Sequence, residues 1–301
     1  MSRRIFHLTV IACFIFSGFL FDSLNAMSWP SADAALAFNF GANNSGKPVL
    51  GMVFSGGTDV IAAESGEIIF SRSKDAEAGF GASRLPSPLG AWTAIDHGDG
   101  LISIYSRYAD DAAPSHNVKY THVEKEQSIA SSGISGWSSQ YGFYFMIFDR
   151  RERRWINPAM IITPMNETRQ PQIVSVELRD IQGNIVSSRN LTQGRYKVFV
   201  NASGGVMRAA NAYAAPFAPH RIVCSVNGAE AGSLNFEAVS ARDGVLMVSR
   251  NGLVPARQVY ANSPAFEAAE VFLTRGQVTL EVIVQDITGA SRSLVSRLIV
   301  N

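Results

Sequence analysis

Residues 94–105 read AIDHGDGLISIY, in which two short apolar runs flank the cluster Asp96-His97-Gly98-Asp99-Gly100. Gly and Asp are typical of tight turns, so this stretch predicts an antiparallel hairpin. The same pattern of short runs, many with apolar residues at every second position, recurs between Gly, Pro, Asn and Asp along the chain. After the first residues, no stretch shows a sustained helical period. We therefore predict an all-β protein.

Two β domains are expected. The segment Thr163–Pro171 is polar and holds two prolines, which indicates a domain edge. After this edge, about seven short strands follow at the turn spacing of an immunoglobulin-like β-sandwich. The predicted units are a β-sheet domain at 46–164 and a sandwich at 165–301, with an N-terminal extension at 27–45. The stretches predicted as strands are Pro48–Phe54, Ile61–Ser71, Ala91–Asp96, Ile102–Tyr108, Gly142–Phe148, Ile173–Leu178, Gly194–Val200, Arg221–Val226, Gly244–Ser249 and Val278–Asp286.

The N-terminus resembles a secretory signal. Arg3 and Arg4 precede an apolar run, and small or polar residues follow it up to Ala26. This order predicts a signal peptide at 1–26 and an exported protein. Two alternatives stay open: an uncleaved signal that anchors the chain in a membrane, because the run approaches the roughly 20 residues that span a bilayer, and lipidation at Cys13.

The charge pattern argues against nucleic acid as a partner. The chain has 26 Lys and Arg against 25 Asp and Glu, and no long basic run. A nucleic-acid-binding surface needs clustered positive charge to contact phosphates. After signal removal only Cys224 remains, so no disulfide is expected, and its alternating strand context predicts a buried thiol.

From about residue 46 to 160, the chain resembles the lysostaphin-type (LytM-like) zinc metallopeptidases. The matching segments stand in the family's order and at its spacing. They are GTDVIAAESGEI at 57–68, the hairpin at 94–105, the glycine-rich SGISGWS at 132–138, GFYF at 142–145 and INP at 156–158. The resemblance implies a LytM-like antiparallel β-sheet domain that precedes the sandwich, and a link to bacterial peptidoglycan.

The same resemblance implies that the zinc site is lost. The family holds zinc with a His four residues before an Asp, with that Asp, and with the second His of a His-x-His strand. These positions here are Ser55, Asp59 and Tyr144. Two further family histidines act in catalysis, and their positions hold Gly142 and Arg107. Serine and tyrosine hydroxyls are poor zinc ligands, and arginine cannot act as a base. We therefore predict no catalytic residue, no bound metal and no cofactor.

The retained polar residues have structural interpretations. Asp59 is expected to bond turn amides beside Gly56 and Gly57, and Arg107 is expected to pair with it. His97 lies in the hairpin turn, where the family has no ligand, so we predict a structural role for it.

The resemblance implies an inactive, peptidase-like protein in the periplasm or at the cell surface of a bacterium. Its groove would use Asp59, Arg107, Trp137 and Tyr144, beside Ser55, to bind peptidoglycan peptides or a cell-wall hydrolase that it regulates. One alternative is an active, divergent zinc endopeptidase with relocated ligands, in which case zinc would be the cofactor. The other is a purely structural envelope protein.

Overall fold

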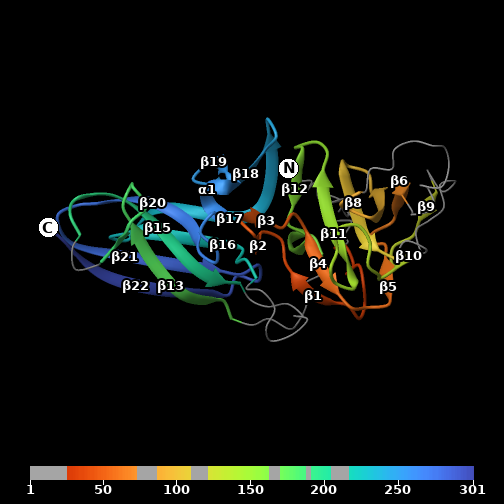
Figure 1. Cartoon of the computed structure of the whole chain (residues 1–301), viewed down its shortest axis with the longest axis horizontal. Helices are drawn as coiled ribbons and strands as arrows, with labels where there is room; N and C mark the ends of the chain where they lie inside the picture. Colours follow the sequence, from red (N-terminus) through yellow and green to blue (C-terminus); the bar gives the residue numbers. More distant parts are fainter. Residues whose placement is uncertain (1–25, 73–86, 110–120, 163–169, 188–190, 205–216) are drawn as a thin grey trace, which may run out of the picture.

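The computed structural model describes residues 26–72, 87–109, 121–162, 170–187, 191–204 and 217–301. The chain forms two lobes that lie side by side along its long axis, an N-terminal lobe (26–162) and a C-terminal lobe (170–301) (Figure 1). In the described ranges, the helices are one 3-10 turn at Pro158–Met160 and α1 (Ala256–Tyr260). All other regular structure is β, and all its strand ladders are antiparallel, so the predicted all-β class is confirmed.

The N-terminal lobe is built on one antiparallel sheet with the strand order β12-β11-β8-β7-β6-β9. Strand β4 pairs with the first half of β11, and β1 pairs with β4. Two small ladders, β2 with β3 and β5 with β10, complete the lobe. The strands are β1 (Ala35–Phe38), β2 (Asn43–Asn44), β3 (Lys47–Pro48), β4 (Met52–Ser55), β5 (Asp59–Ile61), β6 (Gly66–Arg72), β7 (Ala91–Asp96), β8 (Leu101–Tyr108), β9 (His122–Val123), β10 (Ser128–Ser131), β11 (Gly142–Asp149) and β12 (Arg154–Ile156).

Both faces of this sheet carry apolar side chains, as the sequence of β11 shows. Successive side chains in a strand point to opposite faces. Phe143, Phe145 and Ile147 enter the main core of the lobe. Tyr144 and Met146 instead join a small cluster with Ala42 and Val49 on the other face. Because β11 is buried on both faces, it lies at the centre of the lobe.

The predicted hairpin at 94–105 is present as β7 and β8. Its turn is held by His97, whose Nδ1 lies 2.7 Å from the Ser65 carbonyl oxygen and whose Nε2 lies 2.7 Å from the Ser103 hydroxyl. Burial lowers the pKa of His97, which favours the neutral ring. His97 therefore ties the turn to β8 and to the loop before β6, as the structural interpretation predicts.

The C-terminal lobe is a sandwich of two antiparallel sheets. One sheet has the order β14-β13-β15-β20. The other has the order β22-β21-β16-β17, in which β18 pairs with β17 and β19 pairs with β18. The strands are β13 (Gln172–Arg179), β14 (Ile185–Val186), β15 (Gly194–Ser203), β16 (Arg221–Val226), β17 (Ala229–Arg242), β18 (Val245–Arg250), β19 (Leu253–Pro255), β20 (Phe266–Leu273), β21 (Gly276–Gln285) and β22 (Ser291–Val300).

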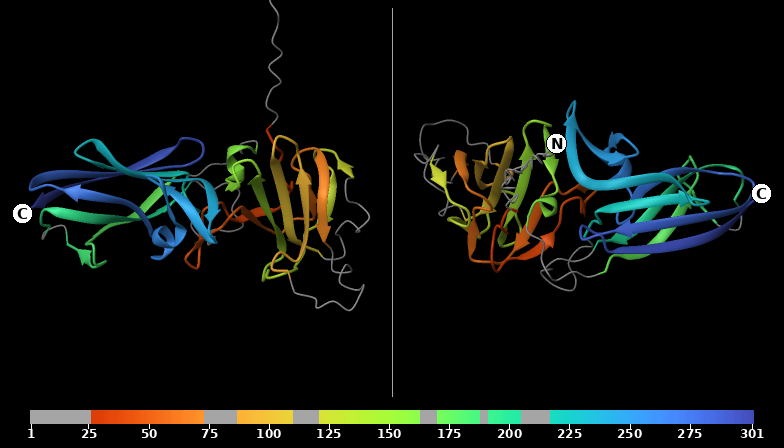
Figure 2. Two further views of the ribbon diagram at one scale, coloured as in Figure 1. Left: turned by 90° about the horizontal axis from the view of Figure 1, so that it is seen from above. Right: turned by 180° about the vertical axis from the view of Figure 1, so that it is seen from behind.

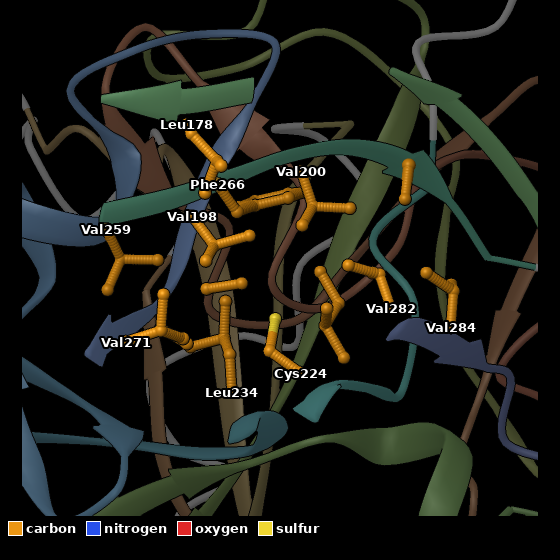
Figure 3. Close-up of a cluster of buried hydrophobic side chains, with 14 of the residues drawn as sticks. Leu178, Val198, Val200, Cys224, Leu234, Val259, Phe266, Val271, Val282 and Val284 are labelled. Carbon is orange, nitrogen blue, oxygen red and sulfur yellow. The ribbon is translucent and has the colours of Figure 1, made fainter. Parts of the chain in front are cut away.

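Side chains from both sheets fill the space between them, and Figure 3 shows Val198 and Phe266 of one sheet facing Cys224 and Val282 of the other. Burial raises the pKa of the Cys224 thiol to about 12, so it behaves as a small apolar side chain. The thiol is free and buried, as predicted.

Two segments join the lobes. Figure 2 shows the two lobes from two further directions. Strand β17 pairs with β16 in the C-terminal lobe and with β12 in the N-terminal lobe, so a single sheet of 14 strands runs through both. The segment predicted as an N-terminal extension also reaches across. Phe40 lies in the C-terminal core, and the Tyr260 hydroxyl donates to the Gly41 carbonyl at 2.9 Å. The extension is therefore part of the packing of both lobes.

Some predictions fall on residues outside the described ranges. The predicted signal peptide, including Cys13, lies there apart from Ala26, and so does most of the predicted domain edge at 163–171. The domain limits stay a prediction. Among the residues that the structure describes, none of the helices has the length and apolar character needed to cross a membrane.

Candidate binding site

Four of the five positions that the resemblance predicts to be degenerate gather where β4, β11 and β8 meet. Ser55 of β4 stands opposite Gly142 of β11, and Val53 stands opposite Tyr144. Opposed side chains in a ladder share a face, as do residues two apart in one strand. The row continues through β8 and β7, because Ser106 stands opposite both Tyr144 and Trp92. One sheet face therefore carries a row of Val53, Tyr144, Ser106 and Trp92, with Ser55 and Gly142 at its end.

Tyr144 is committed to the fold. The residue is 8% exposed, and its hydroxyl accepts the Leu50 N–H at 2.8 Å. Val49 and Ala42, from the segment that carries β2 and β3, pack in the same small cluster. Burial raises the pKa of Tyr144 to about 12, so the phenol stays neutral. At the position to which the resemblance assigns a zinc-binding imidazole, this chain has a phenol that holds the main chain before β4.

Gly142 leaves no room for any side chain. Its φ is +152°, and a Cβ built there would lie 2.0 Å from the Phe54 carbonyl oxygen. Its N–H and C=O both bond Gly133, at 2.9 and 3.0 Å, which fixes the backbone in this position. An imidazole at position 142 is thus excluded by the close approach of β4 and not only by the choice of residue.

Arg107 lies at an irregular step in β8 with a positive φ of 64°. Its N–H donates to the Leu89 carbonyl at 2.8 Å, which supports this turn of the backbone. The guanidinium carbon lies 5.1 Å from the Tyr144 ring centroid, within cation–π range. Its Nε is buried and has no hydrogen-bond partner. In the part of the chain that the structure describes, Arg107 forms no ion pair.

Asp59 lies apart from this group. It begins β5, in a separate two-stranded ladder with β10, and it is exposed. Neither predicted contact of Asp59 is present among the described residues. Asp33 holds the turn instead, because its carboxylate accepts from the Thr58 N–H at 3.3 Å and the Thr58 hydroxyl at 3.2 Å. Hydrogen bonds from the Ser31 hydroxyl and then the Thr58 amide lower the pKa of Asp33.

A hollow of about 250 Å³ opens beside Arg107. Of the predicted groove residues, Arg107 and Trp137 line it, whereas Ser55, Asp59 and Tyr144 do not. The Trp137 side chain is 73% exposed at the rim. We call this site the Arg107 hollow, and its lining residues are Phe38, Asn44, Val49, Val53, Phe54, Arg107, Trp137, Ser138, Ser139, Gln140 and Phe143.

The sequence missed the wall of the hollow that comes from the N-terminal segment. Phe38 and Asn44 lie in the range predicted as an extension, and no local pattern indicates that this range folds against the sheet. Phe40 packs in the C-terminal core, whereas Phe38 and Ala42 pack in the small cluster beside Tyr144, a division that only the fold reveals. Gln140 lies in the loop after the glycine-rich stretch 132–138, and the sequence pattern indicates a binding role only for Trp137 in that region.

The residues at the family positions do not fit zinc. Tyr144 has its oxygen bonded to Leu50, Gly142 has no side chain, and Asp59 lies on another ladder. Across the described ranges, no group of three or more His, Cys, Asp or Glu side chains is arranged to hold a metal ion. A lone exposed carboxylate is a weak site for zinc, which prefers a set of imidazole, thiolate and carboxylate ligands.

A family model matches residues 170–301, which is less than half of the chain. No curated protein matches the sequence.

Among solved structures, the catalytic domain of the prophage-encoded M23 protein EnpA from Enterococcus faecalis, studied as a point mutant, is 16% identical. The match covers 44% of this chain and 94% of that chain with a TM-score of 0.35. A chain of the SpoIIQ–SpoIIIAH pore forming complex is 18% identical over 46% of this chain and 92% of that chain, with a TM-score of 0.36. The antimicrobial peptidase lysostaphin from Staphylococcus simulans is 12% identical over 90% of this chain and 98% of that chain, with a TM-score of 0.33. No function follows from similarities this low, and the antiparallel β architecture itself is consistent with a LytM-like fold.

Proposed function

We propose that this chain is an exported, catalytically inactive, peptidase-like protein of the bacterial cell envelope. It binds peptidoglycan, or it regulates a cell-wall hydrolase, in the periplasm or at the cell surface. The proposal joins the LytM-like motifs of residues 46–160 with the signal-like N-terminus. It assigns the described chain a binding role and no bond-breaking step.

One observation carries the proposal. On the sheet face where the family's histidines would stand, Gly142 has no space for a side chain and the Tyr144 hydroxyl is bonded to the main chain. Hydrolysis by this family's chemistry requires a metal that activates water and a base that titrates near neutral pH. A neutral phenol, a serine hydroxyl and a guanidinium supply neither. The same region nevertheless keeps a hollow with an aromatic rim and one cation, which are features of a binding site.

The first test measures zinc and hydrolysis together. Purified protein is expected to hold far less than one zinc per chain and to release no soluble fragments from purified peptidoglycan sacculi, with or without added zinc. Co-sedimentation with sacculi, or a changed rate of a wall hydrolase, is expected. Stoichiometric zinc with hydrolysis that a chelator removes would show an active enzyme. A protein that neither sediments with sacculi nor changes hydrolase activity would instead be purely structural.

A second test restores two ligands. Ser55 and Tyr144 lie diagonally across the β4–β11 ladder on one face, at a separation that two imidazoles can bridge through a metal ion. The double variant Ser55→His with Tyr144→His is therefore expected to gain zinc binding, measured by metal content after dialysis. Ser55→His alone is the matched control and should gain little. A folded double variant that binds no zinc would contradict the assignment of these positions.

A further inference from the structure

We propose that the Arg107 hollow binds a free carboxylate carried on a small apolar group, such as the C-terminal residue of a peptide. This inference rests on the proposed function and specifies which part of a wall peptide or partner protein enters the site. It concerns the residues around Arg107 and does not depend on Ser55 or Asp59.

Charge is the first support. Among the described residues that line the hollow, Arg107 is the one that carries a charge. Within the described part of the chain, its guanidinium has no carboxylate partner and contacts the Tyr144 ring. Its Nε is buried without an acceptor, so the charge is partly removed from water and is not neutralised by any carboxylate of the described ranges. A partly desolvated cation gains most from an anion that reaches its remaining N–H groups.

The residues that line the hollow indicate which chemical group the carboxylate is attached to. Phe38, Val49 and Val53 give the hollow an apolar side. Ser138, Ser139 and Gln140 also line the hollow and supply hydroxyl and amide groups that can bond a peptide unit. A volume of about 250 Å³ suits one amino-acid residue and not a long segment. Trp137 stands exposed at the rim, where an aromatic ring can cover the bound group.

A carboxylate fits this site better than a phosphate. Arginine binds both through parallel N–H bonds. A phosphate monoester, however, carries a charge of about −1.5 to −2 at neutral pH. One guanidinium in a partly apolar hollow balances a single negative charge, and the other lining residues add none. The carboxylate of a chain end and that of an acidic side chain share this chemistry, so the experiment must separate them.

The test is an NMR titration of the purified protein with four probes, read at the indole and backbone signals of Trp137. N-acetylleucine carries a terminal carboxylate beside an apolar side chain, and N-acetylleucinamide differs from it only in the charge. The α-amide of N-acetylglutamate places its carboxylate on a side chain, and inorganic phosphate tests the other anion. N-acetylleucine is expected to bind saturably, about tenfold or more tighter than its amide, as for a charge-assisted hydrogen bond. It should also bind more tightly than the glutamate derivative and phosphate.

Three variants connect the binding to Arg107. Arg107→Gln is expected to remove the preference for acid over amide, and Arg107→Lys, which keeps the charge, should retain part of it. Trp137→Ala changes an exposed side chain and should weaken the acid and the amide alike; because its indole signal is absent, its titration is read at the side-chain amide of Gln140, which also lines the hollow. Arg151→Gln, at the far end of β11 where Arg151 pairs with Asp99 at 3.0 Å, is the control and should change nothing.

Equal affinity for acid and amide, tighter binding of phosphate, or an acid preference that survives in folded Arg107→Gln would each overturn the inference. Its failure can be separated from failure of the proposed function. Sacculus binding without N-acetylleucine binding removes only the carboxylate site. The carboxylate site without sacculus binding or an effect on a hydrolase removes the proposed wall role.

Discussion

The two ends of the N-terminal sheet are held together in different ways. At the β7–β8 hairpin, a buried histidine fixes the turn, because His97 bonds Ser65 and Ser103. At the β4–β11 end, close backbone packing at Gly142 and the bond from the Leu50 N–H to the Tyr144 hydroxyl occupy the positions that the resemblance assigns to metal and catalytic residues. The comparison teaches that one end of the sheet has space for an imidazole and uses it to stabilise the fold, whereas the other end has no space for one at Gly142.

The largest expected effect comes from placing a histidine at the β4–β11 end, at a position where the resemblance leads us to expect one. Gly142→His would place a Cβ only 2.0 Å from the Phe54 carbonyl oxygen in the present backbone. The strands must move apart, so we expect a loss of about 3 kcal/mol or more in the free energy of unfolding. Urea denaturation followed by fluorescence measures it.

The matched control for this substitution is Gly276→His. Gly276 also has a positive φ, of 109°, but a Cβ there meets nothing within 4 Å. The difference between the two variants isolates the clash with Phe54 from the backbone strain that both share. If Gly142→His were as stable as Gly276→His, the β4–β11 end would be open enough to hold a catalytic side chain, and the comparison of the two ends would break down.

A smaller effect is expected at Tyr144. Tyr144→Phe removes the acceptor of the Leu50 N–H and leaves that donor without its partner, which costs about 1 to 2 kcal/mol. Tyr105→Phe offers a comparison in the main core, because the Tyr105 hydroxyl accepts the Ala63 N–H at 2.7 Å. Tyr141→Phe, on a half-exposed ring, should change stability little. Similar losses at Tyr144 and Tyr105 would show that the former site is now ordinary packing. No loss at Tyr144 would mean that its hydroxyl is available to a ligand.

The sequence predicted the strands best where local pattern alone defines them. The hairpin of β7 and β8 was predicted nearly to the residue, because its turn residues and alternation are contiguous. Two predicted strands are broken in the structure. Pro48–Phe54 divides at Gly51, where a Cβ would lie 2.1 Å from the Phe145 carbonyl oxygen, and Ile61–Ser71 divides before Gly66. These breaks come from close approach to other strands, which a single run of sequence does not record.

Long-range pairing explains what the sequence missed. Strand β17 was not predicted, although it is the longest strand, because its two halves face different environments and pair with β16 in one lobe and β12 in the other. The sequence predicts only an extension at 27–45, yet Phe38 and Asn44 of this segment line the Arg107 hollow. The spacing to the family-like motifs singles out Ser55, Gly142, Tyr144 and Arg107, and their assignment as former metal and catalytic positions stays a prediction. The Arg107 hollow could not be predicted from the sequence, because its lining residues come from segments that are far apart in the chain.

The last and smallest expected effect concerns pH at the hairpin end. Burial lowers the pKa of His97 below its usual value near 6.5, so the unfolded chain binds a proton more readily than the folded chain. The stability that depends on neutral His97 is therefore fully present above about pH 6.5 and is lost as the pH falls towards its folded pKa. Comparing unfolding free energies of the wild type and His97→Gln from pH 8 to pH 5 should show a wild-type advantage that shrinks on acidification. Burial lowers the pKa of His220 as well, but His220 is common to both proteins and cancels in the difference. A difference that stayed constant with pH would mean that His97 is not held neutral by the turn, and that this end of the sheet does not depend on its histidine in the way the retained pattern implies.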